Sequence, residues 1–431
     1  MRRVLIVTGS WVPAMIADMQ RARQLAWCLT ACGWDVEILC PDASFQPPSC
    51  VDDDSAEFFA PDIPAHQVRH QAPWIFRALG VGGIGWRAIW PMWRVGQKLL
   101  ASRRFDLVYI STAQFLLFLL GPAWRRQFGI PYVLDLHDPP HHDTVLRPRL
   151  KHRVARWITK YIESRAVTAA SGLISVSPQY LKLMHRRYAG NNAAWLMADR
   201  QAVIPFGYLP YDLDEAQRLA PVRPVGTQNA PRIVYVGAGG PIMIRAFTLL
   251  CRAMVRLRAR HANSLDHARI ELHGTASAVG HDTERHLARV AQSFGIGPIM
   301  TELPSRVTYR SSVELLLGAD GALILGVDDA GYMPSKLFTY AASGLPLLAV
   351  VRRDGPALAA FATIPRLGHA IWFGDGDMPI DDAADVVAAF LAEVVGRRRF
   401  DRQTDLAPYT ASAMAHRHAA LFDACLSSAA V

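Results

Sequence analysis

The chain has 431 residues, which is long for one hydrophobic core and predicts two or three domains. Hydrophobic residues make up 51% of it, which excludes a disordered protein, and the net charge of +9 favours anionic partners such as phosphates or acidic lipids. Six scattered cysteines form no disulfide or zinc framework, so we expect a reducing compartment, the cytoplasm.

The first half of the chain alternates between strand and helix patterns. Residues 3–9 (RVLIVTG) predict a buried strand rather than a signal peptide, because the apolar run is shorter than the ~7–15 residues of such a signal. Helical spacing follows, with further strands predicted at 35–40, 106–111, 132–138 and 172–177. The longest uncharged run, 107–124, is interrupted by polar residues, Gly and Pro, so we expect no membrane-spanning helix. This alternation is typical of a parallel, doubly wound sheet.

A second alternating series begins near residue 232. Strands are predicted at 232–240, 269–274, 321–326 and 345–351, with a basic helix at 246–260 and another helix at 282–293. Residues 208–231 are rich in Pro and polar residues and predict a linker. The expected domains are therefore 1–207 and 232–407, and a C-terminal helix at about 408–431 is expected to pack on the first.

In order and spacing, these segments resemble the GT-B glycosyltransferases, especially the GT4-like bacterial enzymes of exopolysaccharide and lipopolysaccharide synthesis. The similarity is carried by GWDVEILCP (33–41), GIPYVLDLHDPP (129–140), ISVSPQYLKLMHRRY (174–188), AVIPFGY (202–208), YRSSVELLLGADGALILG (309–326) and SKLFTYAASGLPLLA (335–349). The resemblance implies an α/β fold of two doubly wound, Rossmann-like domains facing a cleft. It also implies a nucleotide-diphosphate sugar donor, UDP-linked by expectation, bound at the strand ends of the second domain.

The turn after residue 236 is the first candidate for donor binding. Gly237, Gly239 and Gly240 would let backbone amides approach phosphate oxygens, and Arg245 would add a charge. A plain tight turn needs glycines as well. His273 ends another predicted strand and either meets the nucleotide or fills the rim.

The segment GYMPSKLFTYAASGLP (331–346) lacks the two glutamates that the family places here. Gly331 and Thr339 stand at their positions, so Thr339 is the expected ribose contact. Pro334 is predicted in a first helical turn, and Ser335 and Lys336 are predicted to face the diphosphate. The alternative is a solvated lysine on an amphipathic helix. This segment also resembles exopolysaccharide transferases without the glutamates, including glucuronosyltransferases of the xanthan type.

The acceptor side is expected in the segment DLHDPPHHD. Asp138 is the leading candidate for activating the acceptor hydroxyl, and His137, which shares a strand face with Asp135, is expected to orient it or bind the donor sugar. His141, His142 and Asp143 suggest either a metal site or a solvated loop. Because GT-B enzymes generally need no metal, we expect no cofactor.

The loop after the first strand is expected to face the cleft. Ser10, Trp11 and Arg21 are its candidates for contact with acceptor or diphosphate.

Residues 72–104 interleave aromatic and basic side chains. Trp86, Trp90 and Trp93, with neighbouring arginines, suit an anionic membrane face, which predicts a peripheral protein on the inner face of the plasma membrane and a lipid-linked saccharide acceptor. The alternative is a helix packed in the first domain. The same mixture stacks nucleic-acid bases, but the chain shows no nucleic-acid module, so no such partner is expected.

Three functions remain open from the sequence. The first is a hexosyl- or glucuronosyltransferase of surface polysaccharide synthesis. The second is a GT-B-type nucleotide-sugar epimerase. The third is a catalytically impaired, nucleotide-binding scaffold, which the missing glutamates would explain.

Overall fold

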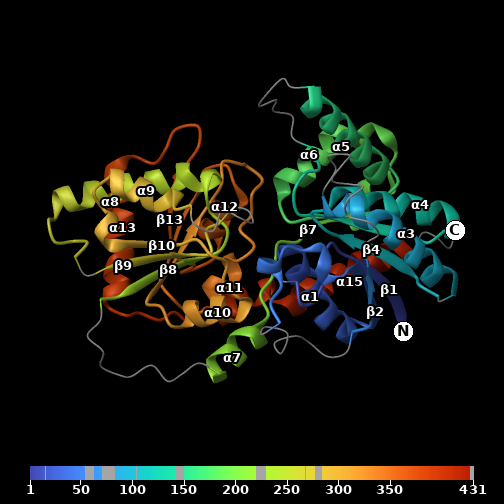
Figure 1. The fold of residues 1–431 in the computed structure, drawn as a ribbon, viewed down its shortest axis with the longest axis horizontal. Helices are drawn as coiled ribbons and strands as arrows, with labels where there is room; N and C mark the ends of the chain where they lie inside the picture. The colour runs from blue at the N-terminus through green and yellow to red at the C-terminus, as the bar shows by residue number, and fades with distance from the viewer. Residues whose placement is uncertain are drawn as a thin grey trace. The chain divides into compact units, whose positions relative to one another are not determined.

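The computed structural model describes residues 1–14, 16–53, 63–69, 83–102, 104–141, 150–219, 230–266, 268–276 and 284–427. The chain forms two compact units: unit 1 comprises residues 1–206 and 411–431, and unit 2 comprises residues 207–410. Each unit is a parallel sheet covered by helices, so the α/β fold class expected from the alternating pattern is confirmed (Figure 1).

Unit 1 is built on a seven-stranded sheet. In sheet order its strands are β3 (Ala65–Val68), β2 (Trp34–Pro41), β1 (Arg2–Val7), β4 (Leu107–Ser111), β5 (Tyr132–Leu136), β6 (Gly172–Ser175) and β7 (Gln201–Val203). The central strands are buried on both faces, which explains their continuous apolar runs. The strand predicted at 132–138 ends at Leu136, so His137 and Asp138 follow it instead of belonging to it.

One face of this sheet carries four helical elements that share a single core. They are α3 (Ile84–Ser102), the 3₁₀ helix η5 (Phe115–Leu119), α4 (Leu120–Phe128) and α5 (Leu150–Thr168). Their buried residues, among them Met92, Leu117, Trp124 and Ile162, pack with alternate strand residues such as Val7 and Leu134 in one cluster. These helices therefore cover the same side of the sheet.

The C-terminal helix α15 (Ala411–Ser427) belongs to unit 1 and packs against α1 (Ala17–Leu29). Its Phe422 ring contacts Trp34 edge-on, with ring centroids 5.4 Å apart. Its His418 is fully buried beside Tyr109, and burial lowers the pKa of this imidazole to about 3. The last helix thus completes the core of the unit in which the chain begins. The described part of unit 1 also contains the α-helix α6 (Pro178–Tyr188).

Unit 2 is built on a six-stranded sheet. In sheet order its strands are β10 (Met300–Leu303), β9 (Arg269–His273), β8 (Arg232–Val236), β11 (Gly321–Leu325), β12 (Leu347–Arg352) and β13 (His369–Phe373). Its helices are α7 (Pro210–Leu219), α8 (Ile244–Arg260), α9 (His286–Ser293), α10 (Tyr309–Leu317), α11 (Leu337–Ala342), α12 (Pro356–Thr363), α13 (Ile380–Val395) and α14 (Gln403–Leu406).

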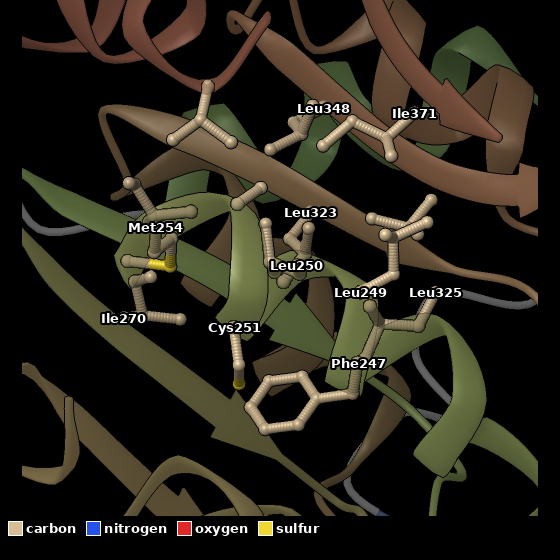
Figure 2. Packing of buried hydrophobic residues seen from close by; sticks show 14 of the residues in the cluster. Phe247, Leu249, Leu250, Cys251, Met254, Ile270, Leu323, Leu325, Leu348 and Ile371 are labelled. Atoms are coloured by element: carbon tan, nitrogen blue, oxygen red, sulfur yellow. The ribbon is translucent and has the colours of Figure 1, made fainter. Parts of the chain in front are cut away.

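The core of unit 2 forms where α8 crosses the sheet. Phe247, Leu250 and Met254 of this helix point toward strand residues such as Leu323 and Ile270 (Figure 2). The basic residues of α8 lie on its outer side, which is why the helix is both strongly basic and well packed.

The prediction that residues 208–231 form a linker is wrong for the first part of this segment. Its first part is the helix α7, which packs on α10 within unit 2, and the Tyr309 hydroxyl donates to the buried Asp212 carboxylate at 2.5 Å. Pro210 opens the helix, a position that tolerates proline because no backbone donor is needed there. Pro-rich composition at this point therefore marks a helix start. Residues 220–229 lie outside the described part of the chain.

Candidate functional site

The carboxyl edge of the unit 2 sheet carries a glycine turn. Gly237 follows β8 with φ +135°, and its N–H donates to the His273 carbonyl at 2.8 Å. The Gly239 N–H donates to the Thr275 carbonyl at 3.2 Å, and Gly240 has φ +81°. These positive φ values are accessible to glycine and costly for other residues, so the backbone of this turn depends on its sequence.

Lys336 lies against this turn. Its ammonium donates to the carbonyl of Val236 and lies 4.7 Å from the centre of the Tyr235 ring. Burial lowers the pKa of Lys336 to about 8. A Cβ atom at Gly237 would lie 1.9 Å from the lysine nitrogen, so the glycine is required for this close approach. The structure therefore positions a cation at a strand end, where an anionic ligand of a doubly wound sheet would bind.

Tyr340, four residues after Lys336, also bonds the backbone at the end of β8. Its hydroxyl donates to the Val236 carbonyl at 2.9 Å and accepts from the Val236 N–H at 3.0 Å. The pairing of β11 with β8 ends at Val234, so the tyrosine bonds the Val236 backbone where β11 does not, and holds α11 against β8.

The helix start predicted at Pro334 is wrong. The helix α11 begins at Leu337, and Pro334 precedes it in a turn whose carbonyl accepts from the Leu337 N–H at 3.1 Å. Lys336 occupies the position just before the helix, and its side chain makes no capping hydrogen bond there. Ser335 and Thr339 are half-buried, so neither is a fully solvated side chain. Gly331, at the other glutamate position, is buried and donates its N–H to the Asp329 carboxylate at 2.7 Å.

A pocket of about 520 Å³ opens beside His273 at the ends of β9 and β10. It is lined by His273, the exposed side chains of Arg285 and Arg306, and neighbouring residues of the segment 303–307. The His273 imidazole is 7% exposed, and its Nε2 lies 3.0 Å from the Glu271 carboxylate, which also pairs with Arg232 at 2.7 Å. Hydrogen bonding to Arg232 lowers the pKa of Glu271 and outweighs its burial.

Sequence reasoning missed the two arginines of this pocket. Arg306 follows β10, a short strand that the sequence pattern did not predict, so nothing marked this loop as a strand end. An Arg-rich pocket at the carboxyl edge of a parallel sheet suits a phosphate or carboxylate group.

Arg245 is placed differently from the expectation. Its guanidinium forms ion pairs with Asp328 at 2.6 Å and Asp377 at 3.5 Å, and donates to the Gly374 carbonyl at 2.7 Å. It therefore connects α8 to the loops after β11 and β13. Because its charge is already balanced by two carboxylates, it is a weaker candidate for a phosphate than Lys336.

In unit 1, Asp135 is the centre of a fully buried polar network. Its carboxylate pairs with Arg21, whose Nη2 lies 3.0 Å from Oδ1, and accepts from the hydroxyls of Tyr109 at 2.5 Å and Ser111 at 2.8 Å. Burial alone would raise the pKa of Asp135, but Arg21 and His137 outweigh it and hold that pKa well below its usual value. Asp135 is therefore a fixed anion.

The placement of Arg21 corrects the expectation that it touches a ligand. Its side chain has no exposed surface, and besides Asp135 it donates to the carbonyls of Ile204 at 2.9 Å and Pro205 at 3.1 Å. The guanidinium thus ties α1 to β5 and to the segment after β7. Its role in this structure is to hold the unit together.

His137 lies beside this network, as its alternation with Asp135 predicted. Its Nε2 is 3.0 Å from the Ser111 hydroxyl and 3.2 Å from the Asp135 carboxylate, and the ring is 8% exposed. Because an ionised carboxylate only accepts, Nε2 carries the proton toward Asp135, and in the neutral ring the lone pair is on Nδ1.

Asp138 is exposed directly after His137. The Tyr180 hydroxyl lies 3.4 Å from its Oδ1 and donates weakly to it. Of the two predicted catalytic residues, Asp138 is thus exposed to solvent, whereas His137 is buried.

Ser10 and Trp11 follow the carboxyl end of β1 and are buried. The Ser10 hydroxyl donates to Asp18 at 2.9 Å, and Thr112 donates to the other Asp18 oxygen at 3.1 Å. Ser10 is therefore part of an internal network, which corrects its expected role as a direct ligand contact. Asp18 and Thr112 were not predicted, although an acidic residue in the first turn of a helix is a usable signal. Burial raises the pKa of Asp18.

The histidines after β5 do not gather around a metal in the described residues. The His141 Nδ1 lies 3.2 Å from Glu163, a buried carboxylate that also accepts from Arg187 at 2.9 Å and Tyr188 at 2.8 Å. His142 and Asp143 lie outside the described residues. Elsewhere in the described ranges, no group of three potential ligands is close enough to hold a metal ion.

The three candidate membrane residues lie on α3. Trp86 is 38% and Trp90 56% exposed, whereas Trp93 packs partly into the core and stacks on Trp90 with ring centroids 4.8 Å apart. Within the described parts of the chain, no helix has the length and apolar character required to span a bilayer.

The comparisons with solved structures identify the fold. The chain is similar over its whole length to solved GT-B structures. Anabaena HepE, in complex with UDP and glucose, is 14% identical with a TM-score of 0.60, and the match covers 98% of this chain and 100% of HepE. The α,α-trehalose 6-phosphate synthase of Burkholderia multivorans is 13% identical with a TM-score of 0.63, covering 100% and 98% respectively. The predicted resemblance to GT-B glycosyltransferases and the GT-B fold are confirmed.

The family comparison is more specific for the first unit. Residues 19–207 match the model of the glycosyl transferase 4-like domain. The same fold also occurs in the UDP-GlcNAc 2-epimerase of Methanocaldococcus jannaschii, which is 11% identical with a TM-score of 0.52 over 98% of this chain and 99% of the epimerase. No curated protein sequence is significantly similar to the chain.

Proposed function

We propose that this protein is a glycosyltransferase that moves a sugar from a UDP-linked donor to a saccharide or lipid-linked acceptor in bacterial surface polysaccharide synthesis. The single observation that carries the proposal is the Lys336 ammonium held beneath the Gly237 turn at the carboxyl edge of unit 2. The glycosyl transferase 4-like match of unit 1 and the UDP-bound HepE neighbour support a nucleotide-sugar donor.

In this proposal unit 2 binds the donor. When the bond between the anomeric carbon and the leaving oxygen breaks, negative charge develops on the departing UDP, and Lys336 stabilises it. The glycine turn offers backbone N–H groups to the same phosphates. Thr339, one helical turn beyond Lys336, is the proposed ribose contact, replacing the charge-assisted bond of a glutamate by a neutral one.

Unit 1 supplies the acceptor chemistry. Asp138 has an exposed carboxylate and accepts the proton of the acceptor hydroxyl if the anomeric centre is inverted. His137, held through Nε2 by Ser111 and Asp135, orients the sugar through its other ring nitrogen, Nδ1. We further propose a hexosyl or glucuronosyl donor, and the Arg285 and Arg306 side chains of the unit 2 pocket favour the glucuronosyl group, because its carboxylate is anionic.

The proposed place of work is the cytoplasmic face of the plasma membrane, reached by peripheral association. The exposed Trp86 and Trp90 on a basic helix support this location, and it would bring the protein to a lipid-linked acceptor. Equal vesicle binding by the wild type and a Trp86, Trp90 and Trp93 triple alanine variant would contradict this part.

The epimerase is the second candidate, because the epimerase neighbour shares the fold. An epimerase needs no acceptor and would convert a nucleotide sugar without releasing UDP. The exposed aromatic and basic helix α3 favours the transferase, because an epimerase has no acceptor to reach at a membrane.

The test begins with a thermal-shift screen of nucleotide sugars, because a ligand that binds only the native protein raises its melting temperature. UDP binding by Lys336→Ala is then compared with Arg252→Ala, an exposed arginine on α8. We expect Lys336→Ala to lose about tenfold or more in UDP affinity, the scale of one charge-assisted hydrogen bond, and the control to be unchanged. Unchanged UDP affinity in Lys336→Ala would refute the donor site, and the absence of any nucleotide-sugar turnover would favour the scaffold.

A further inference from the structure

The helix α5 exposes an aromatic pair that the sequence analysis did not single out. Trp157 is 69% and Tyr161 50% exposed, and their rings stack with centroids 6.0 Å apart and planes 18° apart. Val154, which is 49% exposed, lies three residues before Trp157 on the same side of the helix. Large apolar side chains gathered on an exposed helix side are typical of an interaction surface.

The same helix is strongly basic. Arg153, Arg156, Lys160 and Arg165 are exposed, and no salt bridge among the described residues includes any of them. Its single acidic residue, Glu163, has no exposed side-chain surface and is paired with Arg187. The exposed side of α5 therefore combines aromatic rings with unbalanced positive charge.

The neighbouring helices continue this character. Because α3, α4 and α5 pack on one face of the unit 1 sheet through a shared core, their outer sides lie on the same side of the unit (Figure 1). The sequence has three Lys or Arg on α3, two on α4 and five on α5, against no acidic residue on α3 or α4. Both α3 and α5 carry a stacked aromatic pair, Trp90 with Trp93 on α3 and Trp157 with Tyr161 on α5. We call this surface the α3–α5 face.

We propose that the α3–α5 face docks on an anionic lipid bilayer, with the two aromatic pairs at the headgroup boundary and the basic residues on lipid phosphates. Aromatic side chains prefer this boundary, and each nearby Lys or Arg adds attraction to an anionic surface. A second copy of the chain is disfavoured as the occupant, since it would bring equally positive surfaces together. The inference deepens the proposed peripheral membrane association and adds α5 to it, but it does not depend on the transferase activity.

The test is co-sedimentation of the whole protein with vesicles. Vesicles of phosphatidylcholine with phosphatidylglycerol are compared with vesicles of phosphatidylcholine alone. The wild type is expected to bind the anionic vesicles and to be released as salt increases. Two α5 variants, Trp157→Ala with Tyr161→Ala, and Arg153→Glu with Arg156→Glu, are each expected to bind about tenfold or more weakly.

Two matched controls lie outside the α3–α5 face. Tyr211→Ala removes a 38%-exposed aromatic from α7, and Arg252→Glu reverses an exposed charge on α8; both should bind vesicles like the wild type. The α5 variants should also keep the melting temperature and UDP affinity of the wild type, because their side chains are exposed. Loss of UDP binding in the wild type itself would therefore refute the proposed function and leave the vesicle result intact.

Several results would overturn the inference. They are a wild type that does not bind anionic vesicles, α5 variants that bind as well as the wild type, and equal loss in the two controls. A concentration-dependent dimer that Trp157→Ala dissociates would identify a second copy as the occupant instead. Binding to a single-stranded oligonucleotide but not to vesicles would identify a nucleic acid.

Discussion

A Cβ atom placed on Gly237 would lie 1.9 Å from the Nζ atom of Lys336, so a side chain in the turn after β8 could fit only if the lysine before α11 moved. The contact joins two segments about a hundred residues apart at the edge where a parallel sheet binds ligands. The glycine at this turn thus leaves the space that the Lys336 ammonium occupies.

Gly237→Ala is expected to destabilise the protein and weaken UDP binding for two separable reasons. The positive φ of +135° costs alanine roughly 1–3 kcal/mol, and the methyl group also displaces the Lys336 ammonium. The second cost disappears when the lysine is truncated. Denaturant unfolding of Gly237→Ala in the wild-type and Lys336→Ala backgrounds measures the difference. Equal destabilisation in both backgrounds would show that the two residues are not in contact.

Lys336→Met is expected to raise stability at neutral pH while removing UDP binding. Burial holds the pKa of Lys336 at about 8, against 10.5 in the unfolded chain, so the folded state disfavours the charge. Between these two values the unfolded state holds more protons, so wild-type stability rises with pH and the advantage of the variant shrinks. Melting curves of both proteins from pH 7 to 10.5 test this. A variant less stable than the wild type at pH 7 would contradict it.

The affinity for UDP is expected to fall as the pH rises through about 8. Above that pH the free lysine is increasingly neutral, and a bound phosphate must recover the proton before the ion pair forms. Calorimetric titrations with UDP from pH 7 to 9.5 should show a decline that is absent in Lys336→Arg, whose guanidinium stays charged. A flat profile in the wild type would mean that Lys336 does not contact the diphosphate.

Arg21→Met is expected to destabilise unit 1 by about 3–5 kcal/mol, because it leaves the buried Asp135 carboxylate without its cation. Arg3→Met provides the comparison. Arg3 pairs with Asp35 at 2.9 Å on the surface of the same unit, and an exposed pair of this kind contributes about 0–1 kcal/mol. Denaturant unfolding measures both. Similar losses for the two variants would refute the structural role of Arg21.

Asp138→Asn is expected to slow sugar transfer strongly without changing UDP affinity. A general base contributes about 10²–10⁴-fold to the rate, and the amide keeps the shape of the carboxylate without its basicity. Asp214→Asn, an exposed aspartate on α7, is the matched control. Steady-state transfer assays and UDP titrations separate the two effects. Transfer at the wild-type rate in Asp138→Asn would move the search for a base to His137.

Of the thirteen strands in the described residues, nine were predicted from the sequence, and the four that were missed share a cause. β3, β7, β10 and β13 are the edges of the two sheets, and none of them is buried along its whole length. An edge strand pairs on one side and is partly solvated, so it shows no continuous apolar run. Missing β10 also hid the pocket beside His273 and the arginine that follows the strand.

The sequence by itself determined the two parallel sheets, the glycine turn, Lys336 and the alternation of Asp135 with His137, because these depend on local pattern and spacing. Only the tertiary structure decided which charges are internal. Ser10 precedes α1 and Arg21 lies inside it, near a strand end where ligand contacts often lie, but both bond buried acids. Arg21 pairs with Asp135, 114 residues away, and the Asp18 that accepts from Ser10 also accepts from Thr112, 94 residues away. A side chain's partner and its exposure are set by packing between distant segments, and no local pattern encodes them.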